Sequence, residues 1–209
     1  LLIAISSFSV AQKKAETHSL FEYQGRVEKM PDNKLILIGA ASSVSFDFEG
    51  NSCAILLQSV EEHQNYVSLE LDGKYIGRVR VEKGEVKSFP IAVSNSKKTH
   101  HLSIYKATEA ANGGVLFAGT TAKLVESTAS KKKKKIELIG DSITCGYGND
   151  ASTIPCGSGD WYDQHNAYWA YGPVLSRALD IDFVLSSVSG YGMYRNWNDE
   201  HENEPIIPD

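Results

Sequence analysis

The chain has 209 residues, of which 42% are hydrophobic and 22% charged, and its formal net charge is -5 at pH 7. This composition is that of an ordinary globular protein with enough residues to bury a sizeable core. The acidic balance excludes a broad affinity for phosphate backbones, so we expect no nucleic-acid partner.

Residues 1–12 form an apolar run that ends in small residues, just before Lys13 and Lys14. Such a run is typical of the tail of a signal peptide, here with cleavage after Ala11. A transmembrane helix is the alternative, but a bilayer demands roughly 20 apolar residues. We therefore expect a secreted or periplasmic protein that has no contact with a membrane in its mature form.

Residues 20–128 show short stretches of period-two alternation between turn residues, which indicates antiparallel strands with one buried face. The clearest unit is a hairpin over 66–81, where Asp72-Gly73 supplies the positive φ angles of a tight turn. Cys53 is expected to be a small core residue. The segment predicts a β-sandwich of the jelly-roll kind, with further strands at 34–38, 43–48, 53–58, 101–105 and 115–121.

A run of lysines, Lys131 to Lys135, follows a small and polar stretch. A targeting signal or an anchor to an anionic surface is one interpretation of such a cluster. A solvated linker is the better one, because the run leads directly into an apolar strand. We assign residues 129–134 to this linker.

Residues 135–209 show a different pattern of hydrophobic residues. Apolar strands at 136–139 and 183–185 flank a helical pattern, which is the order of a βαβ unit with a parallel sheet. Gly172-Pro173 interrupts the helical pattern, so a kink or a helix restarting at Pro173 is expected there. The apolar stripe predicted to cover the sheet consists of Ala167, Ala170, Tyr171, Val174, Leu175, Ala178 and Leu179.

The predicted strand at 136–139 is followed directly by Gly140-Asp141-Ser142, which begins a glycine-rich turn that continues to Gly148. Open α/β folds bind ligands at the carboxyl ends of their strands, so this position suits an exposed nucleophile. Gly140 would let the backbone turn sharply, and the amide of Ser142 could face a developing oxyanion. The sequence is not the Gly-x-Ser-x-Gly elbow of α/β-hydrolases, because Thr144 occupies the last position. It resembles the first sequence block of the SGNH (GDSL-type) hydrolases.

A second glycine-containing segment, Ser189-Gly190-Tyr191-Gly192, follows the next predicted strand. It resembles the second SGNH block, whose glycine donates a backbone N–H to the oxyanion. Gly190 is the preferred donor, Gly192 is the alternative, and a plain tight turn is a third possibility.

The order of a β-sandwich followed by Gly140-Asp141-Ser142 and Gly190-Tyr191-Gly192 resembles carbohydrate esterase family two. The resemblance implies an exported SGNH enzyme that removes O-acetyl groups from plant polysaccharides such as xylan and glucomannan, without a cofactor or metal. It assigns Ser142 as the nucleophile, Ser142 and Gly190 as oxyanion donors, and Asp141 as motif support.

That family also uses a histidine and an oxyanion-binding asparagine, which the resemblance places beyond residue 209. We therefore interpret 135–209 as the amino-terminal part of a truncated SGNH domain with an incomplete sheet, and expect the 209 residues alone to be inactive. Neither His165 nor His201 has the Asp-x-x-His setting of the family. Both are expected to be solvated surface residues, as are the remaining candidates His63, His100 and His101. No Cys or His pair has the spacing of metal ligands.

Three further expectations concern side chains near the motifs. Trp161 and Tyr191 could stack on a sugar ring, whereas core packing is expected for Trp169. In an oxidising compartment Cys145 and Cys156 could form a disulfide, or remain two buried thiols. The enzyme is expected to be a monomer.

Two other functions remain open. The β-sandwich could be a noncatalytic carbohydrate-binding module that carries the function alone. The second half could instead be an SGNH enzyme acting on another acyl ester, such as a lipid or a peptidoglycan acetyl group.

Overall fold

The computed structural model describes residues 20–93, 97–127 and 134–198. The signal segment at 1–12, most of the linker at 129–134, and His201 therefore lie outside the described residues. Within the described ranges, none of the helices combines the length and the apolar character that crossing a bilayer requires.

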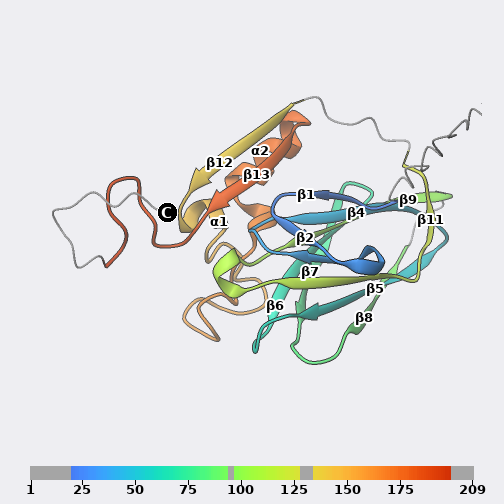
Figure 1. Ribbon diagram of the computed structural model, residues 1–209, viewed down its shortest axis with the longest axis horizontal. Helices are drawn as coiled ribbons and strands as arrows, with labels where there is room; N and C mark the ends of the chain where they lie inside the picture. Colours follow the sequence, from blue (N-terminus) through green and yellow to red (C-terminus); the bar gives the residue numbers. More distant parts are fainter. Residues whose placement is uncertain (1–19, 94–96, 128–133, 199–209) are drawn as a thin grey trace, which may run out of the picture.

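Two antiparallel sheets pack face to face and form the sandwich (Figure 1). One sheet has the order β1-β4-β9-β6-β7, with β11 paired to β4, and the other has the order β2-β3-β10-β5-β8. The strands are β1 Glu22–Gln24, β2 Val27–Lys29, β3 Leu35–Leu37, β4 Ser43–Glu49, β5 Ser52–Ser59, β6 Asn65–Leu71, β7 Lys74–Val81, β8 Lys87–Ala92, β9 Thr99–Lys106, β10 Val115–Thr120 and β11 Lys123–Val125. Short 3-10 turns lie at Pro31–Asn33 (η1) and Ala110–Asn112 (η2).

The alternation of apolar residues accounts for the sandwich core. Along β5, every second side chain is buried, and the buried set includes Cys53, as expected of a small core residue. The predicted hairpin is present as β6 and β7, and Asp72 and Gly73 adopt φ angles of 51° and 76° in its turn. Phe46, Phe48 and Phe117 are among the fully buried residues between the two sheets.

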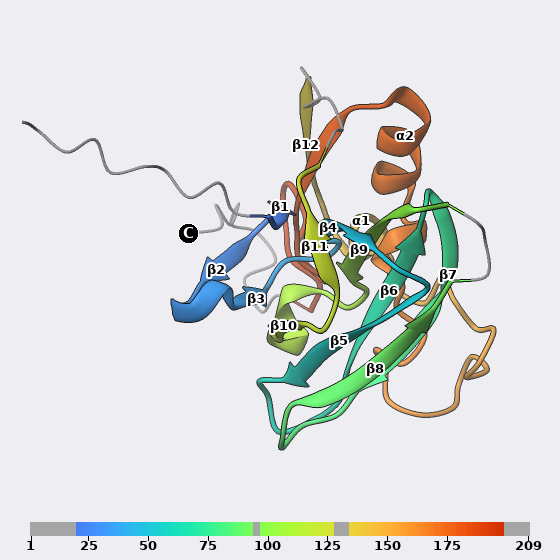
Figure 2. The same cartoon turned by 90° about the vertical axis from the view of Figure 1, so that its right-hand side faces the viewer.

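The second half is a small α/β unit against one side of the sandwich (Figures 1 and 2). It contains β12 Lys135–Gly140, α1 Ser142–Cys145, η3 Ala167–Trp169, α2 Tyr171–Leu179 and β13 Asp182–Ser187. β12 and β13 pair in parallel, with Gly140 opposite Ser187. The predicted combination of an all-β sandwich and a parallel α/β unit is confirmed.

The two units share a buried core. Ala40, Ala41 and Tyr105 of the sandwich pack with Tyr168, Leu138 and Phe183 of the α/β unit. The side-chain amide of Gln24 in β1 also donates to the main-chain oxygen of Phe183 in β13, at 2.7 Å. The sandwich is therefore part of the structural support of the second unit.

The helix differs from its prediction in two respects. It is interrupted at Ala170, whose ψ of 151° is extended, and restarts at Tyr171, so Pro173 lies within the first turn of α2. The face of α2 toward the sheet is built from Gly172, Pro173 and Ser176, and a Cβ at Gly172 would lie 2.9 Å from the Leu138 side chain. The second half of the predicted apolar stripe is exposed: Val174, Leu175, Ala178 and Leu179.

Candidate active site

Ser142 lies at the start of α1, immediately after β12, and its side chain is half-buried. Asp141 precedes it and caps the helix, because its Oδ1 accepts a hydrogen bond from the Ile143 N–H at 3.0 Å. Gly140 is needed for a close approach: a Cβ there would lie 2.1 Å from Thr144 Oγ1. The turn presents Ser142 at the carboxyl end of the strand.

The loop after β13 meets this turn at the same edge. The Val188 N–H donates to the Gly140 oxygen at 3.1 Å, and the Tyr191 N–H donates to the Val188 oxygen at 3.3 Å. Gly190 has a φ of +84°, which favours glycine. Gly192 already donates its N–H to Asn196 Oδ1 at 3.2 Å, so Gly190 is the better candidate for an oxyanion donor.

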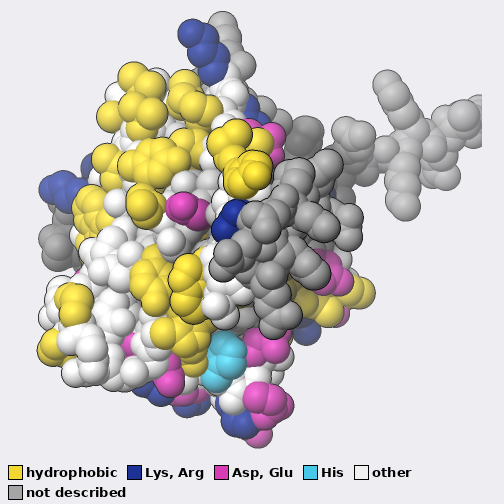
Figure 3. Space-filling model, turned by 90° about the vertical axis from the view of Figure 1, so that its left-hand side faces the viewer, with side chains coloured by type: hydrophobic (Ala, Val, Ile, Leu, Met, Phe, Trp, Pro, Cys, Tyr) yellow, Lys and Arg dark blue, Asp and Glu magenta, His cyan; other side chains and the backbone are white. Residues whose placement is uncertain are grey.

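The face of the molecule shown in Figure 3 looks onto the carboxyl ends of β12 and β13. Patches of hydrophobic side chains cover much of it, with isolated charged groups between them (Figure 3). Ile139 and Ile143, which flank the Ser142 motif, are among the large hydrophobic residues that are exposed. Ser142 therefore lies close in sequence to two exposed isoleucine side chains.

Cys145 and Cys156 are both free thiols, so the disulfide that their sequence setting allows is not present. Cys145 is buried and points toward Glu109 Oε2 (3.3 Å) and Ser187 Oγ (3.2 Å), whereas Cys156 is exposed. Burial raises the pKa of the Cys145 thiol to about 12, which keeps it protonated and able to donate. The alternative of two buried thiols holds for Cys145 alone.

Gly146 connects the end of α1 to residues 166–167. Its φ is +80°, its oxygen accepts the Asn166 N–H at 3.1 Å, and the Ala167 N–H donates to the sandwich residue Ala107 at 2.8 Å. A Cβ at Gly146 would lie 2.8 Å from the Ala167 Cα. The turn that carries Ser142 is thereby positioned against the sandwich through backbone contacts.

Replacing Gly146 with alanine is expected to lower the free energy of unfolding by roughly 2–4 kcal/mol, because strain from the positive φ adds to overpacking against backbone. Gly148→Ala is the matched control: its φ is +64°, but nothing lies within 4 Å of its Cβ. It should cost only about 1 kcal/mol. Urea unfolding of both variants measures the difference, and equal losses would show that the contact with Ala167 is not limiting.

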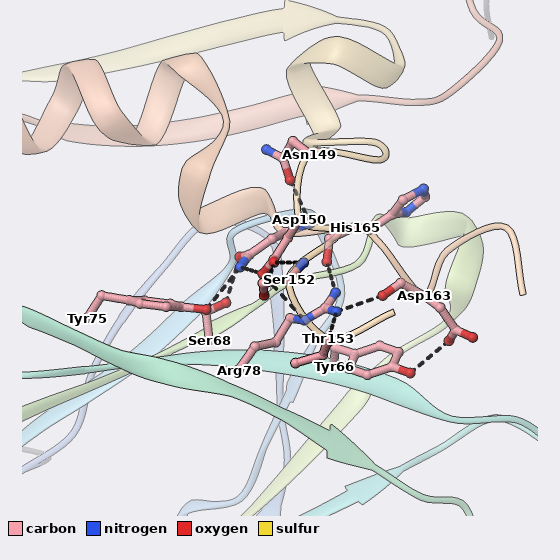
Figure 4. Close-up of polar contacts among 11 residues, drawn as sticks. Tyr66, Ser68, Tyr75, Arg78, Asn149, Asp150, Ser152, Thr153, Asp163 and His165 are labelled. Carbon is pink, nitrogen blue, oxygen red and sulfur yellow. Dashed lines mark hydrogen bonds and ion pairs between the residues drawn. The ribbon is translucent and has the colours of Figure 1, made fainter. Parts of the chain in front are cut away.

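The sandwich also holds the loop between Gly148 and Ala167, chiefly through Arg78 of β7 (Figure 4). The guanidinium donates to the main-chain oxygens of His165 at 2.6 Å and Asp163 at 2.7 Å, and it lies 3.7 Å from the Asp150 carboxylate. Its side chain is 3% exposed. Nearby, the Tyr66 hydroxyl donates to Asp163 Oδ1 at 2.7 Å.

Three polar residues that no local sequence pattern marks as buried are fully buried between the two units: Lys106, Glu109 and His165. Lys106 Nζ donates to Thr108 O, Thr108 Oγ1 and Glu109 O at 2.6–3.1 Å. Burial lowers the Lys106 pKa to about 7, and the Glu109 carboxylate opposes that shift. The three acceptors match the three N–H donors of an ammonium group. This geometry favours the charged form of Lys106, against the effect of burial.

His165 was expected on the surface and is instead completely buried. Its ring packs against Tyr147 and Trp161, with centroids 4.4 and 5.1 Å apart. Neither ring nitrogen has a hydrogen-bond partner among the described residues. Burial lowers its pKa to about 4; Arg78 and Lys106 act in the same direction, and Glu109 and Asp163 oppose it. His100 is buried as well, with Nδ1 2.9 Å from Asp72 Oδ2.

A neutral buried histidine makes stability depend on pH. Because the folded-state pKa of about 4 lies below the ordinary value of 6.5, the unfolded chain binds more protons between these values, and stability falls as the pH drops through that window. We expect a loss of about 3 kcal/mol from this group between pH 6.5 and 4. Chemical denaturation of the protein and of His165→Phe across this range should show a flatter pH profile for the variant, and parallel profiles would contradict the assignment.

The aromatic side chains near the motif are partly exposed. Trp161 stacks on Tyr147, with centroids 5.9 Å apart and planes inclined by 25°, and about half of its surface is accessible. Tyr191 is exposed to a similar degree. Trp169 was expected in the core, but about half of its surface is exposed. Its ring contacts those of Tyr75 and Tyr168. Among the described residues, no group of three or more His, Cys, Asp and Glu side chains could hold a metal ion.

Comparison with known proteins adds three findings. Residues 23–129 match the family described as "Carbohydrate esterase 2 N-terminal". An acetylxylan esterase / glucomannan deacetylase of Cellvibrio japonicus is 28% identical over 162 residues, which are 77% of this chain and 43% of that protein. A cellulase/esterase, CelE, of Acetivibrio thermocellus is 28% identical over 177 residues, 84% of this chain and 21% of that protein.

Among solved structures, a family two carbohydrate esterase from Clostridium thermocellum in complex with cellohexaose superposes with a TM-score of 0.74 and 26% identity. The match covers 86% of this chain and 55% of that one. The chain thus spans less than half the length of the two curated relatives and about half of this structure.

Proposed function

Because the chain belongs to carbohydrate esterase family 2, we propose that it carries the nucleophile of an SGNH-type serine esterase that deacetylates plant polysaccharides. One observation supports this above the others: the parallel pair β12 and β13 brings the Gly140-Asp141-Ser142 turn and the Gly190 loop to the same edge. An acyl-transfer site needs a nucleophile and oxyanion donors in such proximity.

In the proposed reaction, Ser142 Oγ attacks the acetyl carbonyl carbon while a histidine accepts its proton. The tetrahedral oxyanion accepts hydrogen bonds from the Ser142 and Gly190 amides, and the sugar hydroxyl leaves with the proton returned by the histidine. Water then hydrolyses the acetyl-enzyme. We propose that the histidine and a further asparagine donor come from outside the described residues.

The proposed substrate follows from the relatives and from two exposed aromatic side chains. The Cellvibrio japonicus relative is named an acetylxylan esterase and glucomannan deacetylase, and the Clostridium thermocellum structure holds cellohexaose. Trp161 and Tyr191 offer exposed ring faces beside the motif, on which the C–H face of a sugar could stack. Polysaccharide substrates of this kind are extracellular, so we propose that the protein is secreted.

The test compares substrates and an aromatic variant in the complete gene product. We expect acetate release from acetylated xylan and from 4-nitrophenyl acetate, and little activity on long-chain 4-nitrophenyl esters. Trp161→Ala should raise KM for acetylated xylan about two- to tenfold, the range that an aromatic contact contributes. KM for 4-nitrophenyl acetate, which lacks a sugar chain, should stay unchanged. An equal effect on both substrates would contradict a stacking role for Trp161.

The same assay separates the two alternatives. A preference for long acyl chains would favour an SGNH enzyme acting on lipid esters. Binding of polysaccharide without any acetate release would favour a noncatalytic binding module.

A further inference from the structure

The β-sandwich extends one carboxylate into the α/β unit, beside the candidate oxyanion loop. Glu109 lies just after β9, at the start of η2, and is completely buried. Its Oε2 accepts the backbone N–H of Ser189 at 2.8 Å and lies 3.3 Å from the Cys145 Sγ. A single oxygen atom therefore contacts both segments that form the candidate site.

These two contacts belong to the two segments that form the candidate site. Cys145 is the last residue of α1, the helix that begins at Ser142. Ser189 directly precedes Gly190, the candidate oxyanion donor. Cys145 Sγ also lies 3.2 Å from Ser187 Oγ, so a chain of contacts runs from Glu109 through Cys145 to the end of β13. The direction of the Ser189 peptide constrains the Gly190 peptide that follows it.

The contacts of Glu109 hold its side chain in one place. Lys106 Nζ donates to the main-chain oxygen of the same residue at 2.6 Å. A hydrogen bond from an N–H to a buried carboxylate is shorter and stronger than one to a neutral acceptor. Conversely, a buried N–H deprived of its acceptor is costly, so the loop would move to satisfy it.

We infer that Glu109 is a positioning residue of the active site, supplied by the sandwich, that fixes the Gly190 loop relative to the Ser142 turn. This inference rests on the proposed esterase function. It makes the sandwich part of the catalytic apparatus, in addition to any contact with polysaccharide, because the sandwich sets the distance between nucleophile and oxyanion donor. A displacement of about 1 Å at such a position can lower turnover about 100-fold.

The experiment uses three substitutions in the complete gene product, assayed with 4-nitrophenyl acetate. Glu109→Ala removes the acceptor and should lower kcat about 100-fold with KM changed less than threefold. Glu109→Asp withdraws the carboxylate by one methylene and should lower kcat about tenfold. Glu109→Gln keeps an oxygen acceptor and should restore kcat to within about fivefold of the unmodified protein. Rescue by Gln and not by Asp is a pattern that loss of stability alone would not produce.

Glu70→Ala is the matched control. Glu70 Oε2 accepts the Tyr168 hydroxyl at 2.6 Å, so this carboxylate also joins the sandwich to the α/β unit, but away from the motif. Its loss should lower the melting temperature and leave kcat unchanged. Hydrogen exchange of the peptide around 186–191 should accelerate in Glu109→Ala and not in Glu70→Ala.

Ser142→Ala distinguishes the failure of this inference from the failure of the proposed function. If Ser142→Ala is inactive while folded Glu109→Ala and Glu109→Asp keep kcat within threefold, the positioning role is wrong and the esterase stands. If Ser142→Ala stays active, the proposed function itself is wrong. Should Glu109→Ala fail to fold, Glu109→Asp and Glu109→Gln still give the comparison.

Discussion

Substitution of Ser142 by alanine is expected to lower kcat for acetate release by roughly 10⁴- to 10⁶-fold, the range found when a serine nucleophile is removed. The alanine cannot form the acetyl-enzyme, and the residual rate would come from the oxyanion donors and substrate binding alone. KM should change little, because the hydroxyl contributes mainly in the transition state. The fold should be retained, since Ser142 is half-buried and alanine suits the first turn of a helix.

The control for this variant is Ser158→Ala. Ser158 is exposed in the loop between Gly148 and Ala167, and its substitution should leave kcat and KM unchanged. Release of 4-nitrophenol and of acetate measures both variants in the complete gene product. A Ser142→Ala protein that keeps more than about a tenth of the activity would exclude this serine as the nucleophile.

Substitution of Arg78 by methionine is expected to produce the largest loss of stability. Methionine fills most of the volume but leaves the main-chain oxygens of His165 and Asp163 without this donor and removes the ion pair with Asp150. Breaking a buried charged network of this kind costs about 3–5 kcal/mol. The loop that these contacts hold also carries Trp161, so binding of polysaccharide should weaken as the loop loosens.

Arg80→Met is the matched control on the same strand. Arg80 is exposed and pairs with Glu82, which is itself partly exposed, at 2.7 Å. An exposed pair contributes little, so this variant should change the free energy of unfolding by about 0.5 kcal/mol at most. Urea unfolding compares the two variants, and losses of equal size would show that the loop does not depend on Arg78.

The parts of the fold that sequence predicted well are those where a local pattern decides the structure. The Asp72-Gly73 turn requires positive φ angles, and the alternation along β5 follows from one buried face. β8 was missed because it lies at a sheet edge, contains Pro90 and buries little of its surface. The short strands β1, β2 and β11 were also missed, because three residues carry too little periodicity.

The buried polar residues between the two units could not be predicted in the same way. Lys106 and Glu109 are three residues apart, whereas His165 comes from a distant segment, and each is a residue type that is seldom fully buried. They come together only because β9 packs against the 148–167 loop. The hydrophobic periodicity of either segment does not predict that contact. Likewise, the cysteine pair was compatible in spacing, but the burial of Cys145 beside Glu109 and the exposure of Cys156 separate the two thiols.

The most direct test of the central claim is covalent trapping of the nucleophile in the complete gene product. A fluorophosphonate forms a stable bond to an activated serine, and mass spectrometry of the digested protein locates the adduct. We predict one adduct, on the peptide that contains Ser142, appearing in proportion to the loss of acetate release and absent from Ser142→Ala. Inactivation accompanied by an adduct on another residue, with Ser142 unmodified, would contradict the account.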